Sequence, residues 1–400
     1  MSGMETDSGI ASFSLGEEQR QVQELVRRVA NERVAHRAAE IDRTAEYPQD
    51  MFDLLRELGL FTLPFPPEYG GSGSLLSSCV AIEELGRVCY NTAYLLLVQW
   101  TPIGALLAGG SEEQKRRLLP GLANGTLRAG FSLTEPQSGS DVSGIRTRAR
   151  ARARREGNEY RIDGGKIWCT NAAVSDFFLV AARTGEDGTR GVINFFIIER
   201  DRPGFTIGRK EDKLGARGVP SSALFFDNVH VPAENMLGRE GAGFKVVMQA
   251  LNASRPLIAA RAVGLAQGAM DLAISFIRDR RAFGQPVADF QGVRWMIADM
   301  AIAVDAGRQL TYRAAAMADA GITGTEMARA AAVAKCFTTD AAMKVATDAV
   351  QLFGAAGISN EVPINRYFRD AKVLQIIEGT NQIQRNIIAR NILGPEGRPA

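Results

Sequence analysis

The chain has 400 residues, 46% of them hydrophobic, and its 47 Lys and Arg nearly balance its 45 Asp and Glu. This length exceeds one ordinary hydrophobic core, so we expect two or three subdomains. The balanced charge excludes a global field that would attract nucleic acid or an anionic membrane. The four scattered cysteines lack CxxC spacing and only two histidines occur, so neither a disulfide scaffold nor a metal site is predicted. The N-terminus lacks an apolar signal core and no apolar run reaches about 18 residues, so we expect a cytoplasmic protein.

Apolar residues recur at helical spacing along the first predicted domain, residues 14–128. Val22, Val26 and Val29 fall on one face of a predicted helix, and residues 51–58 repeat the pattern. This segment is therefore predicted to be all helical.

The second predicted domain, residues 129–237, changes to short β-rich runs such as DFFLVAA, GVINFFII and ALFFDNVHV. The third, residues 238–393, is Ala-rich and helical again, with Val333, Cys336 and Phe337 on one stripe. Long helices of this kind usually pack as a bundle. The chain thus reads as helical, then β, then helical.

Four motifs carry residues suited to ligand binding. The small hydroxyl residues of FSLTEPQSGSDVSGIRTRA (131–149) suit close approach to a heterocycle or phosphate, although an interdomain loop has the same composition. The Trp of GGKIWCTNA (164–172) is also typical of a core, and the basic RDRRAFGQPVADFQ (278–291) of a helix end. The small residues of QLFGAAG (351–357) allow another backbone or a ligand to come close.

A fifth motif, IIEGTNQIQRN, places Glu378 between an apolar segment and a predicted helix start. A carboxylate there can be a capping charge for the helix that follows. It can also be a base enclosed in an apolar pocket. The residues alone leave both interpretations open.

The order of LTEPxSGSD, KIWCTN, RxxFGxP, QLFGAAG and EGTxQIQR along the chain resembles the acyl-CoA dehydrogenase family. The resemblance implies an α+β multidomain fold: an all-α N-terminal domain, a central β-barrel-like domain and a C-terminal four-helix bundle. It also implies a homo-oligomer, a dimer or tetramer, with FAD between the β domain and the bundle and its adenine end reaching a neighbouring subunit.

The resemblance assigns site residues motif by motif. The implied FAD contacts are Phe131, Leu133, Thr134, Gly139, Ser140, Trp168, Thr170, Arg280, Phe283, Gln291, Gln351, Gly354, Thr380 and Gln382, with Gln351 and Gly354 coming from the partner subunit. The implied substrate contacts are Ser140, Asn252, Arg255, Tyr94 and Gly379.

The resemblance makes Glu378 the catalytic base. It would remove the α proton of an acyl thioester while the β hydrogen leaves as hydride to flavin N5, giving the trans-2-enoyl thioester. Burial against Ile376 and Ile377 should raise the pKa of the carboxyl. Hydrogen bonds from the Glu378 backbone N–H and a ribityl hydroxyl would stabilise the thioester oxygen. Some relatives carry the base at the position of Ser254, which cannot serve unaided.

The acyl group is less closely defined by the residues. Tyr94, with Leu95, Val98 and Trp100, resembles the family's acyl-pocket wall, although this spacing is also typical of core. Relatives that act on glutaryl-CoA have an arginine after a tyrosine here, whereas Asn91 follows Tyr90, which argues against a short dicarboxylic substrate. Chain length, branching, and CoA or carrier protein as the thioester partner stay open.

Three functions are compared. The first is a dehydrogenase in fatty-acid metabolism that passes electrons to an electron-transferring flavoprotein. The second is an oxidase or monooxygenase on the same fold, and Glu378 counts against the monooxygenase. The third is a non-catalytic scaffold, which the complete set of FAD and base motifs disfavours.

Overall fold

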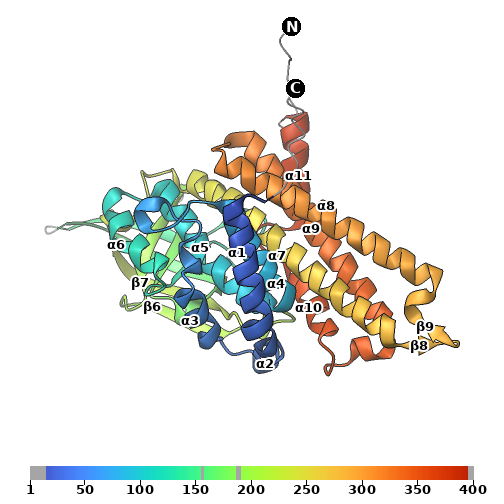
Figure 1. The fold of residues 1–400 in the computed structure, drawn as a ribbon. Helices are drawn as coiled ribbons and strands as arrows, with labels where there is room; N and C mark the ends of the chain where they lie inside the picture. Colours follow the sequence, from blue (N-terminus) through green and yellow to red (C-terminus); the bar gives the residue numbers. More distant parts are fainter. Residues whose placement is uncertain (1–14, 155–156, 186–190, 395–400) are drawn as a thin grey trace, which may run out of the picture.

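The computed structural model describes residues 15–154, 157–185 and 191–394, so the predicted first boundary at residue 14 lies outside the described residues. The first part is helical, as predicted, and its described residues form six α-helices: α1 (Glu17–Val29), α2 (Ala38–Thr44), α3 (Gln49–Glu57), α4 (Leu75–Val88), α5 (Tyr90–Gly109) and α6 (Glu112–Ala123). They pack in front of the sheet in Figure 1. The Ser74 hydroxyl caps α4 and a capping box of Ser111 and Gln114 begins α6.

Two helices are apolar on nearly every face because they are core helices. By length and composition alone, α5 and α7 (Gly243–Asp279) could each cross a membrane, but 78% of each apolar window is buried. A helix that is hydrophobic all round belongs in the interior of a large protein or in a membrane. Here the packing of α5 and α7 against each other and against α4 accounts for their composition.

The described residues of the β part form one seven-stranded sheet: β1 (Ala129–Ser132), β2 (Arg148–Arg154), β3 (Gly157–Thr170), β4 (Phe177–Thr184), β5 (Val192–Glu199), β6 (Phe205–Lys210) and β7 (Ser221–Pro232). Strands β1 and β2 lie end to end along one edge of β4, and β5 pairs with the other edge. From there the order continues through β3 and β7 to β6. No strand pairing among the described residues joins β6 to β5, so the sheet is open where a barrel-like domain was predicted.

Both faces of β4 are buried, which explains its continuous apolar sequence. Phe177 and Leu179 face the core shared with the N-terminal helices, whereas Phe178 and Val180 face a second core inside the sheet. Strands covered on both faces lack the alternation of half-exposed strands.

The remaining helices form the C-terminal part: α7, α8 (Gln291–Asp319), α9 (Gly324–Phe353), α10 (Ile364–Leu374) and α11 (Asn381–Leu393). Both α10 and α11 pack against α9, so the predicted bundle of four is built here from five described helices. The short strands β8 (Arg281–Ala282) and β9 (Gln285–Pro286) connect α7 to α8 at the end of the long helices away from the sheet (Figure 1).

The predicted apolar stripe on α9 lies at the surface of the bundle. Phe337 is exposed and Val333 half-buried, and with Cys336 and Ala341 they line a hollow of about 550 Å³ between α8, α9 and α11. The buried side of α9 is instead made of small residues such as Ala331, Ala334 and Ala342. The helix therefore has apolar residues on two sides, and one of them is uncovered in the single chain.

A buried ion pair joins the LTEP and KIW motifs. Lys166 Nζ lies 2.6 Å from Glu135 Oε1 with both side chains almost fully enclosed, and it also donates to the Leu133 carbonyl. Glu135 accepts further hydrogen bonds from the backbone N–H groups of Arg146 and Thr147. Burial alone would raise the pKa of Glu135, but Lys166 and these donors lower it to about 2. The pair holds the loop after β1 against β3.

Lys166→Met is expected to destabilise the fold by about 3–5 kcal/mol, because it leaves Glu135 buried without its counter-charge. The matched control is Lys115→Met, which removes a pair with the exposed Glu112 and should cost less than about 1 kcal/mol. Urea unfolding at neutral pH measures both, and Lys166→Met/Glu135→Gln should recover part of the loss. Equal stability of Lys166→Met and the control would show that the pair does not hold this loop.

Candidate active site

Glu378 lies on the turn between α10 and α11, and its carboxylate does not cap the helix. The cap of α11 is Thr380, whose hydroxyl accepts from the Ile383 N–H. Glu378 has a φ of 56° and Gly379 a φ of 89°, and a left-handed conformation is costly for a residue with a Cβ. The capping interpretation is therefore wrong, and the strained turn points the carboxylate into the protein.

The Glu378 carboxylate meets the face of α7. Its Oε2 accepts a hydrogen bond of 2.9 Å from the Ser254 hydroxyl, so the two alternative base positions are neighbours in space. Burial raises the pKa of Glu378, while the Ser254 hydrogen bond and then the charges of Arg255, Arg261 and Lys335 act to lower it. The result is a carboxyl whose pKa is raised, and a raised pKa makes a stronger base.

The backbone on both sides of Gly379 is held by buried polar side chains that the sequence did not single out. Lys335 Nζ donates to the Gly379 carbonyl (2.9 Å) and to Asn381 Oδ1 (2.8 Å), and Gln384 Nε2 donates to the Gly379 carbonyl (2.9 Å). All three side chains are buried. Lys335 comes from the middle of α9, so its role depends on a long-range contact.

The predicted flavin residues of β1 and β3 lie side by side. The Ile167 N–H donates to the Thr134 carbonyl (2.9 Å), and Cys169 lies against the Phe131 carbonyl. Trp168 has a φ of 59° within an irregular part of the pairing with β7, and its side chain is 53% exposed. The core interpretation of Trp168 is therefore wrong, because an indole in the core would be covered.

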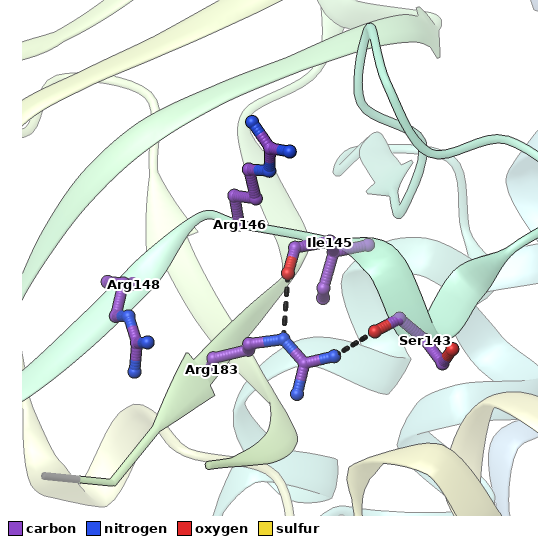
Figure 2. A pocket seen from close by; sticks show the side chains of 5 residues that line it. All are labelled: Ser143, Ile145, Arg146, Arg148 and Arg183. Carbon is purple, nitrogen blue, oxygen red and sulfur yellow. Dashed lines mark hydrogen bonds between the residues drawn. The ribbon is translucent and has the colours of Figure 1, made fainter. Parts of the chain in front are cut away.

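Gly139 and Ser140 lie in the exposed part of the loop between β1 and β2. A hollow of about 370 Å³ follows them, lined by Ser143, Ile145, Arg146, Arg148 and Arg183. Figure 2 shows the Arg183 guanidinium donating to the backbone carbonyls of Ser143 and Ile145, the latter at 2.7 Å. Arg183 thus attaches this loop to β4, and its guanidinium has a structural role.

Tyr94 connects the flavin side with the base. Burial raises the pKa of its phenol; Arg261, by its charge and as a donor, and the Thr170 hydroxyl act to lower it, and Glu378 to raise it. The Tyr94 phenol on α5 therefore interacts with both Thr170 of β3 and Glu378 of the turn before α11. Trp100, in contrast, donates Nε1–H to the Phe61 carbonyl (2.9 Å) inside the helical core. Of the predicted wall residues, Tyr94 faces the site and Trp100 does not.

A second group of predicted FAD residues lies at the β8–β9 end of the bundle, away from the sheet to which the strand of Trp168 belongs (Figure 1). Arg280 ends α7, Phe283 is 96% exposed and Gln291 begins α8. The rings of Phe276 and Phe353 stack at 4.3 Å and bring the ends of α7 and α9 together, which places Gln351 and Gly354 at the same end. Within one chain, the predicted flavin residues therefore lie in two separate groups.

The remaining predicted contacts lie near Glu378 or beside it in the chain. Arg255 is buried and donates Nη1–H to Asn252 Oδ1 (2.8 Å). Burial lowers the pKa of Arg255 to about 10, against the attraction of Glu378. Gln382 is exposed on the first turn of α11.

Three family models match consecutive parts of the chain. They are described as the acyl-CoA dehydrogenase N-terminal domain (residues 16–126), middle domain (130–229) and C-terminal domain (241–393). The chain belongs to the acyl-CoA dehydrogenase family. It is therefore an enzyme, a flavoprotein oxidoreductase with FAD as its cofactor and acyl-CoA as its substrate.

Relatives and solved structures agree with this assignment. Cyclohexane-1-carbonyl-CoA dehydrogenase of Geobacter metallireducens is 44% identical over 385 residues, which are 95% of this chain and 99% of the relative. Butyryl-CoA dehydrogenase from Megasphaera elsdenii has a TM-score of 0.90 at 36% identity and covers 96% of this chain and 100% of its own. A chain of the structure described as the electron transferring flavoprotein of Acidaminococcus fermentans has a TM-score of 0.90 at 38% identity, with the same coverage.

The residues present suit the FAD of an acyl-CoA dehydrogenase. The half-exposed Trp168 indole offers an aromatic surface beside Thr134. Arg280 makes no ion pair among the described residues, and arginine suits a diphosphate. Gly354 has a φ of 61° and nothing within 4 Å of a built Cβ, so a ligand can approach its backbone.

Ser254→Ala is expected to move the acid limb of the pH dependence of flavin reduction to higher pH. The Ser254 hydroxyl stabilises the ionised carboxylate, so its loss raises the pKa of Glu378 further. Stopped-flow flavin reduction with one acyl-CoA across a pH series measures the shift. Ser275→Ala, an exposed position on the same helix, is the control. An unmoved acid limb would show that the hydroxyl does not act on the base.

Proposed function

We propose that the protein catalyses α,β-dehydrogenation of an acyl-CoA to the trans-2-enoyl-CoA with Glu378 as the base. The observation that carries this proposal is the half-buried Glu378 carboxylate, which has a raised pKa, accepts from Ser254 and projects from a strained left-handed turn. Backbone strain concentrates where a surrounding structure holds a functional group in place. Glu378 would take the α proton, and FAD supplies the acceptor to which the β hydrogen passes as hydride.

The Glu378 backbone also suits stabilisation of the thioester oxygen. Its N–H donates no hydrogen bond within the described part of the chain, whereas the neighbouring Gly379 carbonyl is occupied by Lys335 and Gln384. An N–H held in place by such contacts can donate to a developing enolate without rearrangement. The same turn would therefore present both the base and an oxyanion donor.

Glu378→Gln is expected to slow flavin reduction by about 10²- to 10⁴-fold, the range typical of losing a general base. The amide keeps the volume of the side chain and can still accept from Ser254. Rapid mixing with a good acyl-CoA under anaerobic conditions, at matched FAD content, measures the rate. Reduction at the wild-type rate would remove Glu378 from the mechanism.

The melting temperature of the same variant tests the electrostatics separately. A carboxyl with a raised pKa in the folded state adds stability below its usual pKa and loses this contribution as the pH rises through its folded pKa. Glu378→Gln should therefore match or exceed the stability of the wild type at neutral pH. Destabilisation at neutral pH, with none in acid, would show that the ionised carboxylate is a structural group.

The proposal includes a homo-oligomer, a dimer or tetramer, in which each FAD site is completed by a second subunit. Support comes from the two separated groups, Trp168 with Thr170 in the sheet and Arg280 with Phe283 at the far end of the bundle. The uncovered apolar stripe around Phe337 offers further contact area. An electron-transferring flavoprotein is proposed as the acceptor, supported by the neighbour described above.

Subunit mixing tests the shared site. Trp168→Ala and Arg280→Ala are each expected to lose FAD. Refolding or co-expressing the two together should restore about a quarter of the sites in a statistical mixture of dimers, because each mixed dimer has one unaltered site. FAD absorbance after gel filtration counts the sites, and Arg278→Ala, exposed near the end of α7, replaces Arg280→Ala in the control mixture. No recovery, or a monomer by light scattering that retains FAD, would contradict the shared site.

A further inference from the structure

Arg261 is a fully buried arginine whose charge acts on the base, while its N–H groups have no function in the reaction. Its relative exposure is 0%, and its Nε, Nη1 and Nη2 atoms make no hydrogen bond of normal geometry among the described residues, the Tyr94 phenol being a polar group within their reach. Its Cζ lies 3.9 Å from the centre of the Tyr94 ring and 4.3 Å from that of Tyr90. The two aromatic faces compensate part of the desolvation of the cation, but they do not occupy its N–H groups. A buried charge without hydrogen bonds is costly and is rarely kept without a function.

The position of Arg261 connects it to the active site. It lies seven positions after Ser254 on α7, so both lie on the same face, about 10 Å apart along the axis. The charge of Arg261 acts on the Glu378 carboxyl and on the Tyr94 phenol. Tyr94, in the helix predicted to form the acyl-pocket wall, interacts with both the guanidinium and the base. The guanidinium therefore lies against a predicted wall residue of the acyl pocket.

The charges around Arg261 do not balance it. Lys213 is a half-buried cation whose pKa Arg261 acts to lower. Asp370 also acts on Tyr90 and Lys213, but it accepts a hydrogen bond from the Ala216 N–H (2.7 Å). Neither Asp370 nor Glu378 forms an ion pair with Arg261 in the described part of the chain. No carboxylate in the described part of the chain therefore neutralises Arg261 by direct contact.

Helix α4 leaves room for the arginine. A Cβ built on Gly86 would lie 3.2 Å from the Arg261 carbonyl oxygen and 3.6 Å from its Cγ, so the absence of a side chain at Gly86 admits this close approach. The stem of Arg261 packs there, while the guanidinium is turned to the tyrosines of α5.

We propose that Arg261 binds a carboxylate at the far end of the acyl group, so that the enzyme acts on monothioesters of medium-length dicarboxylic acids with CoA. Guanidinium presents paired N–H donors that match a carboxylate, and a charge-assisted pair would satisfy the donors that the protein leaves open. This inference rests on the proposed function and specifies its substrate class. The absence of arginine at Asn91 argues only against the short acids bound from α5, since Arg261 reaches the region from α7.

The test compares thioesters of equal chain length with and without the terminal carboxylate: adipoyl-CoA against hexanoyl-CoA, and pimeloyl-CoA against heptanoyl-CoA. In the wild-type holoenzyme, kcat/KM is expected to favour the carboxylated member of at least one pair. Arg261→Met should reduce this preference by about 100-fold or more, because a site built for a polar group discriminates strongly. The loss should appear mainly in KM, since the contact is remote from the reacting carbons.

Two further variants complete the experiment. Arg261→Lys keeps the charge and should recover part of the preference, whereas Arg28→Met, an exposed position on α1, should keep it. A wild type that reduces its flavin with the alkyl thioesters and disfavours both carboxylated ones would overturn the inference and leave the dehydrogenase function standing. Because the wild-type enzyme alone gives this comparison, it tests the inference even if Arg261→Met fails to fold. Failure of every thioester to reduce the flavin would instead overturn the proposed function, and the inference with it.

Discussion

The active site depends on one backbone constraint, the left-handed turn at Glu378 and Gly379. A turn in this conformation costs free energy for a residue with a Cβ, and the buried side chains of Lys335, Asn381 and Gln384 offset that cost through the Gly379 carbonyl and the start of α11. Lys335 is itself strained electrostatically, since burial lowers its pKa to about 8. The bundle thus uses buried polar groups, rather than apolar packing, to hold the carboxylate against α7. Because those groups lie on α9 and α11, the base is positioned by the same helices that form the bundle.

The predicted flavin residues of the sheet are also held in place by buried polar groups. Lys166 and Glu135 form the only enclosed ion pair between Lys and Glu that the described residues contain, and between them they bind the Leu133 carbonyl and the N–H groups of Arg146 and Thr147. Both motifs that supply flavin contacts are therefore attached at one point. The irregular stretch of β3 next to that point exposes Trp168. The Lys166–Glu135 ion pair therefore lies next to the stretch of β3 that exposes the Trp168 indole.

The sequence predicted the features that depend on local pattern or on motif order. Helical spacing and β-rich runs gave the order of the three parts, and IIEGT identified Glu378. The sequence could not show that Thr380, two residues later, caps α11, because Glu378 and Thr380 both stand where a helix cap is expected. It missed Lys335 and Arg261 because each is a single charged residue in an Ala-rich helix, a pattern typical of a solvated face. Only the packing of α9 against α11 and of α7 against α4 and α5 shows that both are buried.

Burial raises the pKa of Glu378 and the nearby positive charges lower it, so the strength of the base depends on its surroundings. Burial raises the pKa of the carboxyl, and a carboxyl that is protonated cannot accept a proton. Arg255, Arg261 and Lys335 counter it without forming an ion pair with the carboxylate, because their contacts are to Asn252, to the tyrosines of α5 and to the Gly379 carbonyl. A direct ion pair would lower the basicity of the carboxylate and occupy the oxygen that must accept the proton. Cations held at a distance by other partners keep the carboxyl ionisable and leave one oxygen, Oε1, without a hydrogen bond among the described residues.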